Sequence, residues 1–544
     1  MKKIIFAFIL IGITFSNQAQ ILSNKEGKYT KADSLRGSLR PERTNFDVLK
    51  YDLHVKVDPE ERYISGVNSI TLRVLKPAQR LQLDLFENMK VDSIVFQEKH
   101  LSYQREFNAV FIDFPLPLDG NKDIKIDFYY SGNPIVAKNP PWDGGFIFTE
   151  DKNGKPWVSV AVQGAGASLW YPNLDHQSDE PEEAEIHVAA PNGLMNVSNG
   201  RFTGKKDLQN GYTEWSWKVT NPINNYNIIL NIGDYVHLHD TYKDLDLDYY
   251  VLSYNKEKAE QQFKEVTPMM DCFYEKFGAY PFIEDSYKLV ETPYLGMEHQ
   301  SAVAYGNGFK NGYLGQDLSR TGIGLKWDYI LIHESAHEWF GNSITSKDIA
   351  DMWIHEAFTT YAESVYVECR WGKEDALTYL SGLRRGVMNN SAIIGDYGVN
   401  TGGSSDMYYK GANMLNTIRS VINDDNQWWT LLKEYTETYK HQIIDTPTVI
   451  SFFEQHTKAK LTPIFNQYLK YSRLPELQLK EKNNKVYARW NTDVEDFDMP
   501  LILNVNGKEV HVSPTNQWKK MPFKKSLKEV KVDLKNYYIL VNKE

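Results

Sequence analysis

One stretch of the chain, HESAHEWFGNSITSKDIADMWIHE at residues 333–356, constrains the fold more than any other. His333 and His337 lie four residues apart, so on an α-helix both imidazoles project from the same face and can reach one ion. Glu334 would then lie beside that ion, where a general base has to be. Apolar residues recur at helical spacing around the motif, and a following Gly-Asn pair supplies the signal that ends the helix.

Glu356 turns this pattern into a prediction of a catalytic zinc site. It lies in a second amphipathic segment, and the polar residues 343–348 connect the two segments. If both segments are helices that pack side by side, Glu356 returns to the two histidines. Two imidazoles and one carboxylate leave the fourth tetrahedral position open for water, as in catalytic zinc sites. A four-cysteine structural zinc is excluded because the chain holds only Cys272 and Cys369.

The alternative interpretation is a solvated helix that carries two surface histidines by chance. With 13 His in 544 residues, a chance H-E-x-x-H occurs in roughly one such chain in fifty. The carboxylate of Glu356 at the expected distance favours the metal site, and we predict one Zn²⁺ ion held by His333, His337 and Glu356.

Length and composition indicate a large protein of several domains. The hydrophobic content of 42% and the aromatic content of 13% are sufficient for large cores. The formal net charge is −10 and the sequence has no long basic run, so we expect no nucleic-acid partner. These properties leave the oligomeric state unknown.

The N-terminal residues MKKIIFAFILIGITFSNQAQ predict a signal peptide over residues 1–19. Lys2 and Lys3 form a positive region, and the apolar run that follows is too short to span a bilayer as a stable helix. The alternative is an N-terminal anchor. We expect a mature protein that is exported to the periplasm or the medium without stable membrane insertion, and a polar leader segment over residues 20–44.

The hydropathy pattern predicts a multidomain α+β fold. Strand-like alternation runs through residues 45–250, where Tyr51, Leu53 and Val55 alternate with polar residues, so we expect an N-terminal β domain. Helical spacing dominates residues 251–473. Short alternating strands with an Asn-Gly turn return in residues 474–544 and predict a small β-sandwich.

Two details of the helical part can be predicted locally. Thr446-Pro447 and Thr462-Pro463 are typical helix starts, with Thr as the N-cap and Pro at the first helical position. Pro268 is expected to kink or split the helical stretch around it. Cys272 and Cys369 can pair or remain buried free thiols, and their helix-like surroundings favour the free thiols.

Two further motifs stand before and after the zinc segment, YLGMEHQSAVAYG at residues 294–306 and MYYKGANML at residues 407–415. With these motifs the chain resembles the aminopeptidase N and leukotriene hydrolase family of gluzincin-type zinc aminopeptidases. The family pattern is H-E-x-x-H-x18-E, preceded by G-x-M-E-N and followed by Y-x-K-G. The resemblance implies a saddle-like N-terminal β domain and a thermolysin-like catalytic domain. Since the chain ends at Glu544, we expect no C-terminal helical domain.

The resemblance assigns substrate binding to the first motif. In the family its glutamate, here Glu298, binds the free α-amino group of the substrate, and the motif lies on an edge strand that lines the substrate groove. Gly296 and Met297 retain the family residues. Leu295 replaces the first glycine and His299 replaces the asparagine, which affects the expected positioning of the scissile carbonyl.

The resemblance also implies two further groups. Tyr408 matches the tyrosine that donates a hydrogen bond to the developing oxyanion, with Tyr409 as the neighbour that competes for this assignment. Gln163 lies nine residues before Pro172, with Asp175 close behind, as in the family. Gln163 is therefore expected near the substrate amine.

The function implied is hydrolysis of the first peptide bond of peptides with a free N-terminus, with zinc-activated water and Glu334 as general base. Three alternatives remain: a thermolysin-type endopeptidase, an epoxide-hydrolysing relative, and a non-catalytic binding protein on the same scaffold. The preferred N-terminal residue of the substrate is not determined by the sequence.

Overall fold

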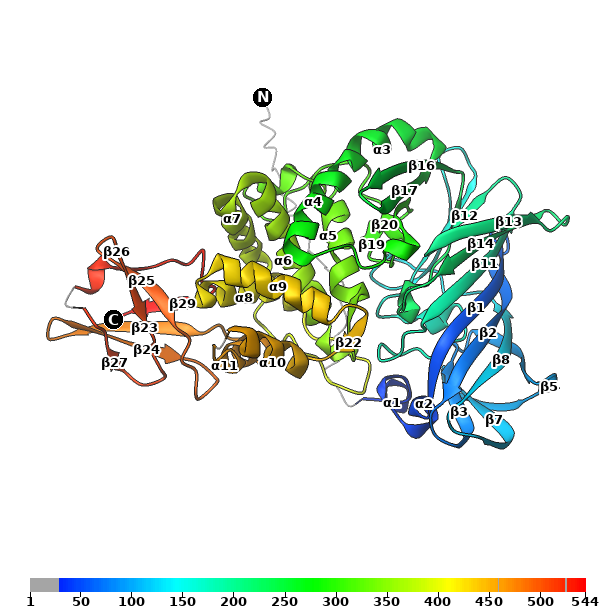
Figure 1. Ribbon diagram of the computed structural model, residues 1–544, viewed down its shortest axis with the longest axis horizontal. Coiled ribbons are helices and arrows are strands. Elements are labelled where there is room, and N and C mark those ends of the chain that lie inside the picture. The colour runs from blue at the N-terminus through cyan, green and yellow to red at the C-terminus, as the bar shows by residue number, and fades with distance from the viewer. Residues whose placement is uncertain (1–28, 458, 524–525) are drawn as a thin grey trace, which may run out of the picture.

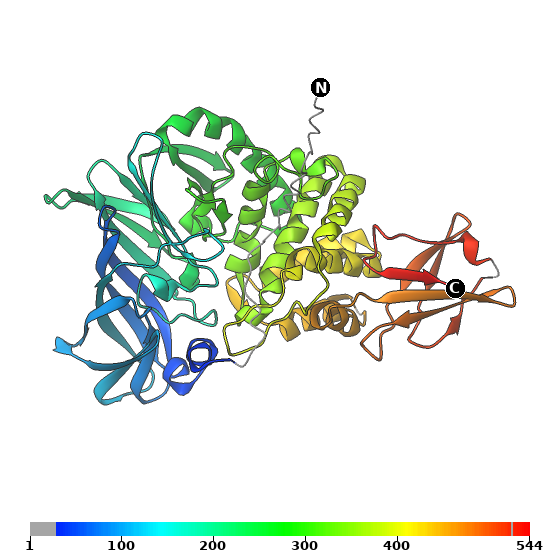
Figure 2. The same cartoon turned by 180° about the vertical axis from the view of Figure 1, so that it is seen from behind.

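The computed structural model describes residues 29–457, 459–523 and 526–544, which form three parts in a row (Figure 1). A β-rich part comes first, a mostly helical part lies in the middle, and a small β part lies at the far end, as the opposite view also shows (Figure 2). The predicted signal peptide, residues 1–19, lies outside the described residues. No described helix has the length and apolar character needed to cross a membrane.

The N-terminal part is built on an eight-stranded sheet. In spatial order its strands are β13 (Arg201–Asp207), β14 (Tyr212–Val219), β11 (Glu183–Pro191), β1 (Phe46–Asp58), β2 (Tyr63–Val74), β8 (Lys122–Gly132), β4 (Met89–Phe96) and β5 (Lys99–His100). The alternation predicted for β1 is confirmed, because Tyr51, Leu53 and Val55 are buried while the residues between them are partly exposed. One face of this sheet therefore contributes to the core.

Two smaller sheets complete this part of the molecule. One contains β3 (Ala78–Asp84), β7 (Ala109–Leu118) and β6 (Ser102–Glu106). The other contains β12 (Met195–Val197), β15 (Asn231–Gly233), β10 (Pro156–Ala161) and β9 (Gly145–Glu150). Apolar residues of all three sheets share one hydrophobic cluster, so they fold as one unit.

The end of the predicted leader segment, residues 20–44, is folded where the structure describes it. Helices α1 (Lys31–Gly37) and α2 (Pro41–Thr44) lie beside β3 (Figure 1). Leu35 and Arg43 are buried there. The expectation of a polar leader missed this packing, because three buried residues, of which only Leu35 is a large apolar one, leave no detectable period in a polar run.

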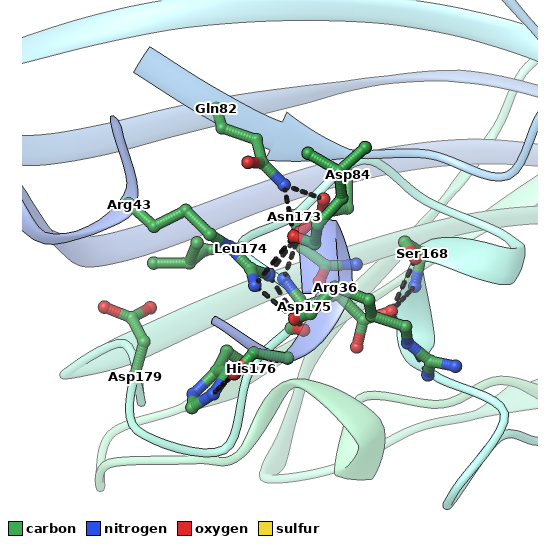
Figure 3. A network of polar contacts seen from close by, with 12 residues as sticks. Arg36, Arg43, Gln82, Asp84, Ser168, Asn173, Leu174, Asp175, His176 and Asp179 are labelled. Atoms are coloured by element: carbon green, nitrogen blue, oxygen red, sulfur yellow. Dashed lines mark hydrogen bonds and ion pairs between the residues drawn. The ribbon is translucent and has the colours of Figure 1, made fainter. Parts of the chain in front are cut away.

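Arg43 lies at the centre of a buried polar network (Figure 3). Its guanidinium donates to Asp84 at 2.6 Å and to the Asp175 carbonyl oxygen at 3.0 Å, and it also donates to the Arg36 carbonyl oxygen. Burial raises the pKa of Asp84, and the charge of Arg43 opposes that rise. The network joins α1 and α2 to the loop that follows β10.

The middle part begins earlier than the predicted boundary at residue 250. Its sheet has the order β16 (Tyr235–Tyr242), β17 (Leu245–Leu252), β18 (Tyr287–Glu291), β20 (Val303–Tyr305) and β19 (Gly296–Met297). The predicted boundary cuts through β17. Alternation indicates a half-buried strand but not the sheet that the strand joins, and this explains the difference.

Helices cover this sheet and form the rest of the middle part. They are α3 (Lys256–Gln262), α4 (Val266–Phe277), α5 (Tyr329–Ala336), α6 (Trp353–Trp371), α7 (Lys373–Leu383), α8 (Asp406–Ile422), α9 (Asp425–Thr438), α10 (Thr446–Thr457) and α11 (Thr462–Lys470). Two short strands, β21 (Ile344–Ser346) and β22 (Gln442–Ile444), pair in parallel. Helices α10 and α11 start at the predicted Thr-Pro pairs, but Thr446 and Thr462 are the first helical residues, and the N-cap of α11 is Leu461. A 3-10 turn at Phe263–Glu265 splits the stretch that contains Pro268.

Cys272 of α4 and Cys369 of α6 form a disulfide, with their Cα atoms 6.0 Å apart. The preference for free thiols was therefore wrong. Packed helical surroundings do not argue against pairing when two neighbouring helices each present one cysteine at the same level.

The C-terminal part consists of two small sheets. One contains β27 (Lys519–Lys520), β24 (Lys485–Asn491), β23 (Glu476–Lys482) and β29 (Leu540–Lys543), and the other contains β26 (Lys508–Val512), β25 (Leu501–Val505) and β28 (Val530–Val532). The predicted Asn506-Gly507 turn joins β25 to β26. Buried residues of both sheets, such as Leu479 and Leu503, belong to the same hydrophobic cluster as the helical part.

The buried pair Arg43–Asp84 generates a stability prediction. Arg43→Met leaves the Asp84 carboxylate buried without its cation, so we expect a loss of about 3–5 kcal/mol in the free energy of unfolding. Chemical denaturation of the full chain measures it. The double variant Arg43→Met/Asp84→Asn should recover part of the loss, and a single variant within about 0.5 kcal/mol of wild type would contradict the role assigned to the pair.

Candidate active site

Helix α5 carries the H-E-x-x-H motif, as predicted. The helix starts at the N-cap Asp328, whose side chain accepts a hydrogen bond from the Leu331 amide at 3.2 Å. After His337 the chain leaves the helix through a kink at Gly341, which has φ 128°. A Cβ at this position would lie 3.1 Å from Nδ1 of His337. The glycine thus permits both the positive φ and the close approach to a predicted ligand.

Helix α6 returns Glu356 to the two histidines. Its Oε2 lies 3.8 Å from Nε2 of His333 and 3.5 Å from Nε2 of His337. Zinc bonds of 2.0–2.1 Å place tetrahedral ligand atoms about 3.3 Å apart, so the spacing fits one ion. Glu356 Oε2 is buried without a hydrogen-bond partner among the described residues. An uncompensated buried carboxylate oxygen is costly, and a cation between these three ligands removes that cost.

The far nitrogens of both imidazoles are held by second partners. His333 Nδ1 lies 2.6 Å from Oε1 of Glu363, whose Oε2 accepts a hydrogen bond from Tyr379 at 2.7 Å. His337 Nδ1 lies 2.9 Å from the Phe340 carbonyl oxygen. Such contacts fix the ring orientation and leave Nε2 toward the metal.

Glu363 was not predicted from the sequence, although a signal was available. Glu363 lies seven residues after Glu356, two helical turns along the same face of α6. Tyr379 comes from α7 and carries no local signal.

Burial and charge act on the two imidazoles in opposite directions. Burial lowers the pKa of His333 to about 3, so this ring stays neutral, as a metal ligand must be. Burial also disfavours the charged form of His337, but the carboxylates of Glu356 and Glu298 outweigh it and raise the pKa of that ring to about 10. Burial also raises the pKa of Glu334 well above its ordinary value, and the charges of Glu298 and Glu356 act in the same direction. A carboxylate with a raised pKa can both accept and return a proton.

The segment with Glu298 lies on the edge strand β19, as the resemblance implied. Gly296 allows β19 to pack against α5, because a Cβ there would lie 2.6 Å from Cγ2 of Ile330 and 3.1 Å from Oε1 of Glu334. The Met297 side chain is buried in a small apolar cluster with Tyr294. The backbone of the motif therefore lies near the site, while the Met297 side chain belongs to the core.

Glu298 lies beside the predicted metal ligands. One carboxylate oxygen each of Glu298 and Glu334 and one ring nitrogen of His337 all lie within 4.8 Å of one another. Glu298 Oε1 accepts hydrogen bonds from Nε2 of Gln163 and, at 3.0 Å, from the hydroxyl of Tyr226. Gln163 and Glu298 are thus brought together as predicted. Tyr226, at a 3-10 turn spanning Asn225–Asn227, was missed because it stands in no recognisable motif.

The loop that carries Gln163 is held by the network around Arg43. The Arg36 guanidinium donates to the Gly164 carbonyl oxygen at 3.2 Å and also to the Ala165 carbonyl oxygen. Oδ2 of Asp175 accepts from the Ser168 hydroxyl at 2.5 Å (Figure 3). The N-terminal helix α1 therefore fixes the loop next to the Glu298 carboxylate.

Tyr408 lies at the start of α8, and its ring stacks toward His333 with ring centroids 6.3 Å apart. Burial raises the pKa of its phenol, and the nearby charge of Glu356 raises it further, so the hydroxyl keeps its proton. Lys410 points elsewhere, donating to the carbonyl oxygens of Tyr471 and Ser472 at 2.8 and 2.9 Å. The lysine of this motif thus ties α8 to the chain after α11.

His299, which departs from the family pattern, is fully buried and has no hydrogen-bond partner on either ring nitrogen among the described residues. Burial lowers the pKa of His299 to about 3, so the ring is neutral. The neighbouring backbone is nonetheless held, because the side-chain Nδ2 of Asn342 donates to the Glu298 carbonyl oxygen at 2.7 Å.

Comparison with known protein families identifies the family to which this chain belongs. Residues 262–468 match the Peptidase family M1 domain, and residues 48–226 match the Peptidase M1 N-terminal domain. The chain belongs to peptidase family M1. The resemblance inferred from the three motifs is thereby confirmed.

Known relatives of this M1 chain are distant. It is 21% identical over 398 residues to a leucyl aminopeptidase of Saccharolobus solfataricus, covering 69% of this chain and 50% of that protein. It is 22% identical over 416 residues to an aminopeptidase N of Rattus norvegicus, covering 67% and 42%. The chain therefore spans about half the length of the curated relatives it matches.

Solved structures show the same fold. An M1 zinc metallopeptidase mutant from Deinococcus radiodurans, bound to a Tyr-Ser-Ala substrate, has a TM-score of 0.66 and 19% identity. The match covers 81% of this chain and 98% of that one. A β-rich N-terminal domain followed by a helical catalytic domain is thus an M1 arrangement.

Glu363 provides a test of the metal centre. Glu363→Ala removes the partner of His333 Nδ1, so we expect zinc affinity to fall about 10- to 100-fold, measured by competition with a chromophoric chelator. Glu368→Ala is the matched control on the same helix, because Glu368 pairs with Arg419 at 2.6 Å instead. Equal losses in both variants would show that helix stability, not ligand orientation, sets the affinity.

Proposed function

We propose that this M1 chain is a zinc-dependent aminopeptidase, which hydrolyses the first peptide bond of peptides with a free N-terminus. The observation that carries the proposal is the position of Glu298. Its buried carboxylate lies beside Glu334 and His337 and is oriented by Gln163 and Tyr226. A buried carboxylate next to the reacting centre is the partner that a desolvated α-ammonium group requires.

One Zn²⁺ ion would be held by His333, His337 and Glu356. When bound, zinc supplies a Lewis acid and lowers the pKa of a water molecule at the open position. The donor set of two imidazoles and one carboxylate is typical of catalytic zinc sites, and the buried, unpartnered Glu356 Oε2 supports the assignment.

The chain's own residues carry out the remaining steps. Glu334 accepts a proton from the attacking water and delivers it to the leaving amine. Tyr408, protonated and aimed into the site from α8, donates a hydrogen bond to the carbonyl oxygen as negative charge develops there. Its proximity to His333 supports Tyr408 rather than Tyr409 in this role.

Glu298 sets the register of the substrate. By holding the α-ammonium, it places the first peptide bond, and no later bond, within reach of Glu334 and the zinc ligands. Gln163 and Tyr226 both donate to the Glu298 carboxylate, which keeps an oxygen oriented toward the amine. A thermolysin-type endopeptidase needs no such carboxylate, so this contact favours the exopeptidase.

We further propose that the mature protein is exported to the periplasm or the medium. The charged and apolar pattern of residues 1–19 supports this, and a disulfide between Cys272 and Cys369 is compatible with an oxidising compartment.

The base assignment is tested by Glu334→Gln. The amide keeps the shape of the side chain but does not accept the proton, so we expect zinc content to remain at wild-type level while kcat falls at least about 100-fold. Metal analysis and hydrolysis of an aminoacyl chromogenic amide measure the two quantities. Turnover close to wild type with full zinc would refute Glu334 as the base.

The register assignment is tested by Glu298→Ala. Losing a charge-assisted hydrogen bond of about 1.5–3 kcal/mol lowers kcat/KM for free-amine peptides about 10- to 100-fold. The same peptide with an acetylated N-terminus is the matched control and should change far less. Equal losses of kcat/KM for both peptides would argue for the endopeptidase. Measuring the zinc content of the variant shows whether the metal site is intact.

A further inference from the structure

Strands β1 and β11 carry a second group of histidines, far from α5 in the fold. They lie next to each other in the large sheet (Figure 1) and pair in parallel, with His54 opposite His187. The two rings stack with centroids 4.2 Å apart and an interplanar angle of 12°. Asp52 precedes His54 by two residues and therefore projects from the same face. None of these residues takes part in the proposed function.

The donor atoms of this group converge. Asp52 Oδ1 lies 3.1 Å from Nε2 of His54 and 3.5 Å from Nε2 of His187, and the three ligand atoms all lie within 4.8 Å of one another. Asp52 Oδ1 is nevertheless buried without a hydrogen bond of acceptable geometry from any described residue. A carboxylate oxygen that faces two imidazole nitrogens without a hydrogen bond is placed to share a cation with them.

The catalytic centre provides an internal comparison. There Glu356 Oε2 is also buried and unpartnered, at 3.8 and 3.5 Å from two imidazole Nε2 atoms. The group at Asp52 also combines two imidazoles with one carboxylate whose facing oxygen lacks a hydrogen bond of good geometry, at equal or shorter distances, but it is only partly buried.

Outer contacts also follow the pattern of metal ligands. Nδ1 of His187 lies 2.8 Å from the Ser216 hydroxyl, and Nδ1 of His54 lies 3.5 Å from Glu214 Oε2, both from β14. These contacts turn both Nε2 atoms toward Asp52 and supply a carboxylate behind one imidazole, which increases its basicity as a ligand.

Both lysines of β1 interact with other groups. Lys56 lies over the Tyr212 ring at 4.0 Å, and Lys50 pairs with Glu183 and Glu185 at 2.9 and 2.6 Å. Neither ammonium group forms an ion pair with Asp52, whose carboxylate faces the imidazoles of His54 and His187 instead.

A second surface group, His237, His239 and Asp248, lacks this property. Asp248 Oδ1 lies within hydrogen-bonding distance of both rings, at 2.7 and 3.1 Å, and its bonding is satisfied. This group is explained by hydrogen bonds alone and serves as a control.

We propose that Asp52, His54 and His187 form a second site for a divalent transition-metal ion, separate from the catalytic centre. Imidazole and carboxylate donors suit zinc and copper, and the partial exposure of His54, 43% of its side chain, leaves room for water as a further ligand. Such an ion links β1 to β11 at the one parallel pair of the large sheet and would stabilise the N-terminal domain when bound.

Zinc titration of the full-length protein, stripped with a chelator, tests the proposal. Calorimetry should give two zinc equivalents for wild type, one for His187→Ala and one for Asp52→Asn, which keeps the size of the side chain. His239→Ala is the matched control and should keep two. Circular dichroism and aminopeptidase activity with one zinc equivalent should match wild type in every variant, because none of these residues belongs to the catalytic site.

Three results would overturn the proposal. If the wild-type protein binds a single zinc equivalent, the second site does not exist. A second equivalent that survives both His187→Ala and Asp52→Asn lies elsewhere, and one that is lost in His239→Ala lies at the other histidine group. Failure of the proposed peptidase activity is a distinct outcome, since the zinc count of the second site does not depend on turnover.

Discussion

The burial of Glu356 next to His333 and His337 is the constraint around which α5 and α6 are arranged. A carboxylate oxygen with no hydrogen bond, 2% exposed as a residue, is stable only beside a cation or a proton. The kink at Gly341 turns the chain after α5 so that α6 can return this carboxylate to the imidazoles. Glu363, on the same helix, then fixes the orientation of one ring. The packing of α5 against α6 therefore also positions the three proposed metal ligands.

The substrate side of the site is shared between two domains. Glu298 comes from the edge of the catalytic sheet, whereas Gln163 and Tyr226 come from the N-terminal domain. The loop with Gln163 is itself held by Arg36, and Arg36 is held in place by the helices that the Arg43–Asp84 pair anchors. The proposed recognition of the amine would therefore depend on how the two domains pack, while the proposed metal ligands belong to one domain alone.

The same rule of charge compensation distinguishes the two surface histidine groups. Asp248 has its oxygen satisfied by the imidazoles beside it, whereas Asp52 Oδ1 lies 3.1 and 3.5 Å from two imidazole Nε2 atoms without a hydrogen bond of good geometry. Composition alone does not separate the two groups, since each holds two histidines and an aspartate. The two groups differ in whether one buried carboxylate oxygen accepts a hydrogen bond. The same criterion supports zinc at Glu356.

The sequence by itself determined what depends on neighbours a few residues apart. The spacing of His333 and His337 specified a common helix face, the alternation in β1 specified its buried side, and Thr-Pro pairs marked helix starts. Only the tertiary structure decided the disulfide between Cys272 and Cys369, the boundary ahead of β16, the contact of Tyr226 with Glu298 and the parallel pairing that sets His54 against His187. The reason is physical. The periodicity of apolar residues depends on which side of a segment is buried, whereas these contacts join distant segments that only the packing of the whole chain brings together.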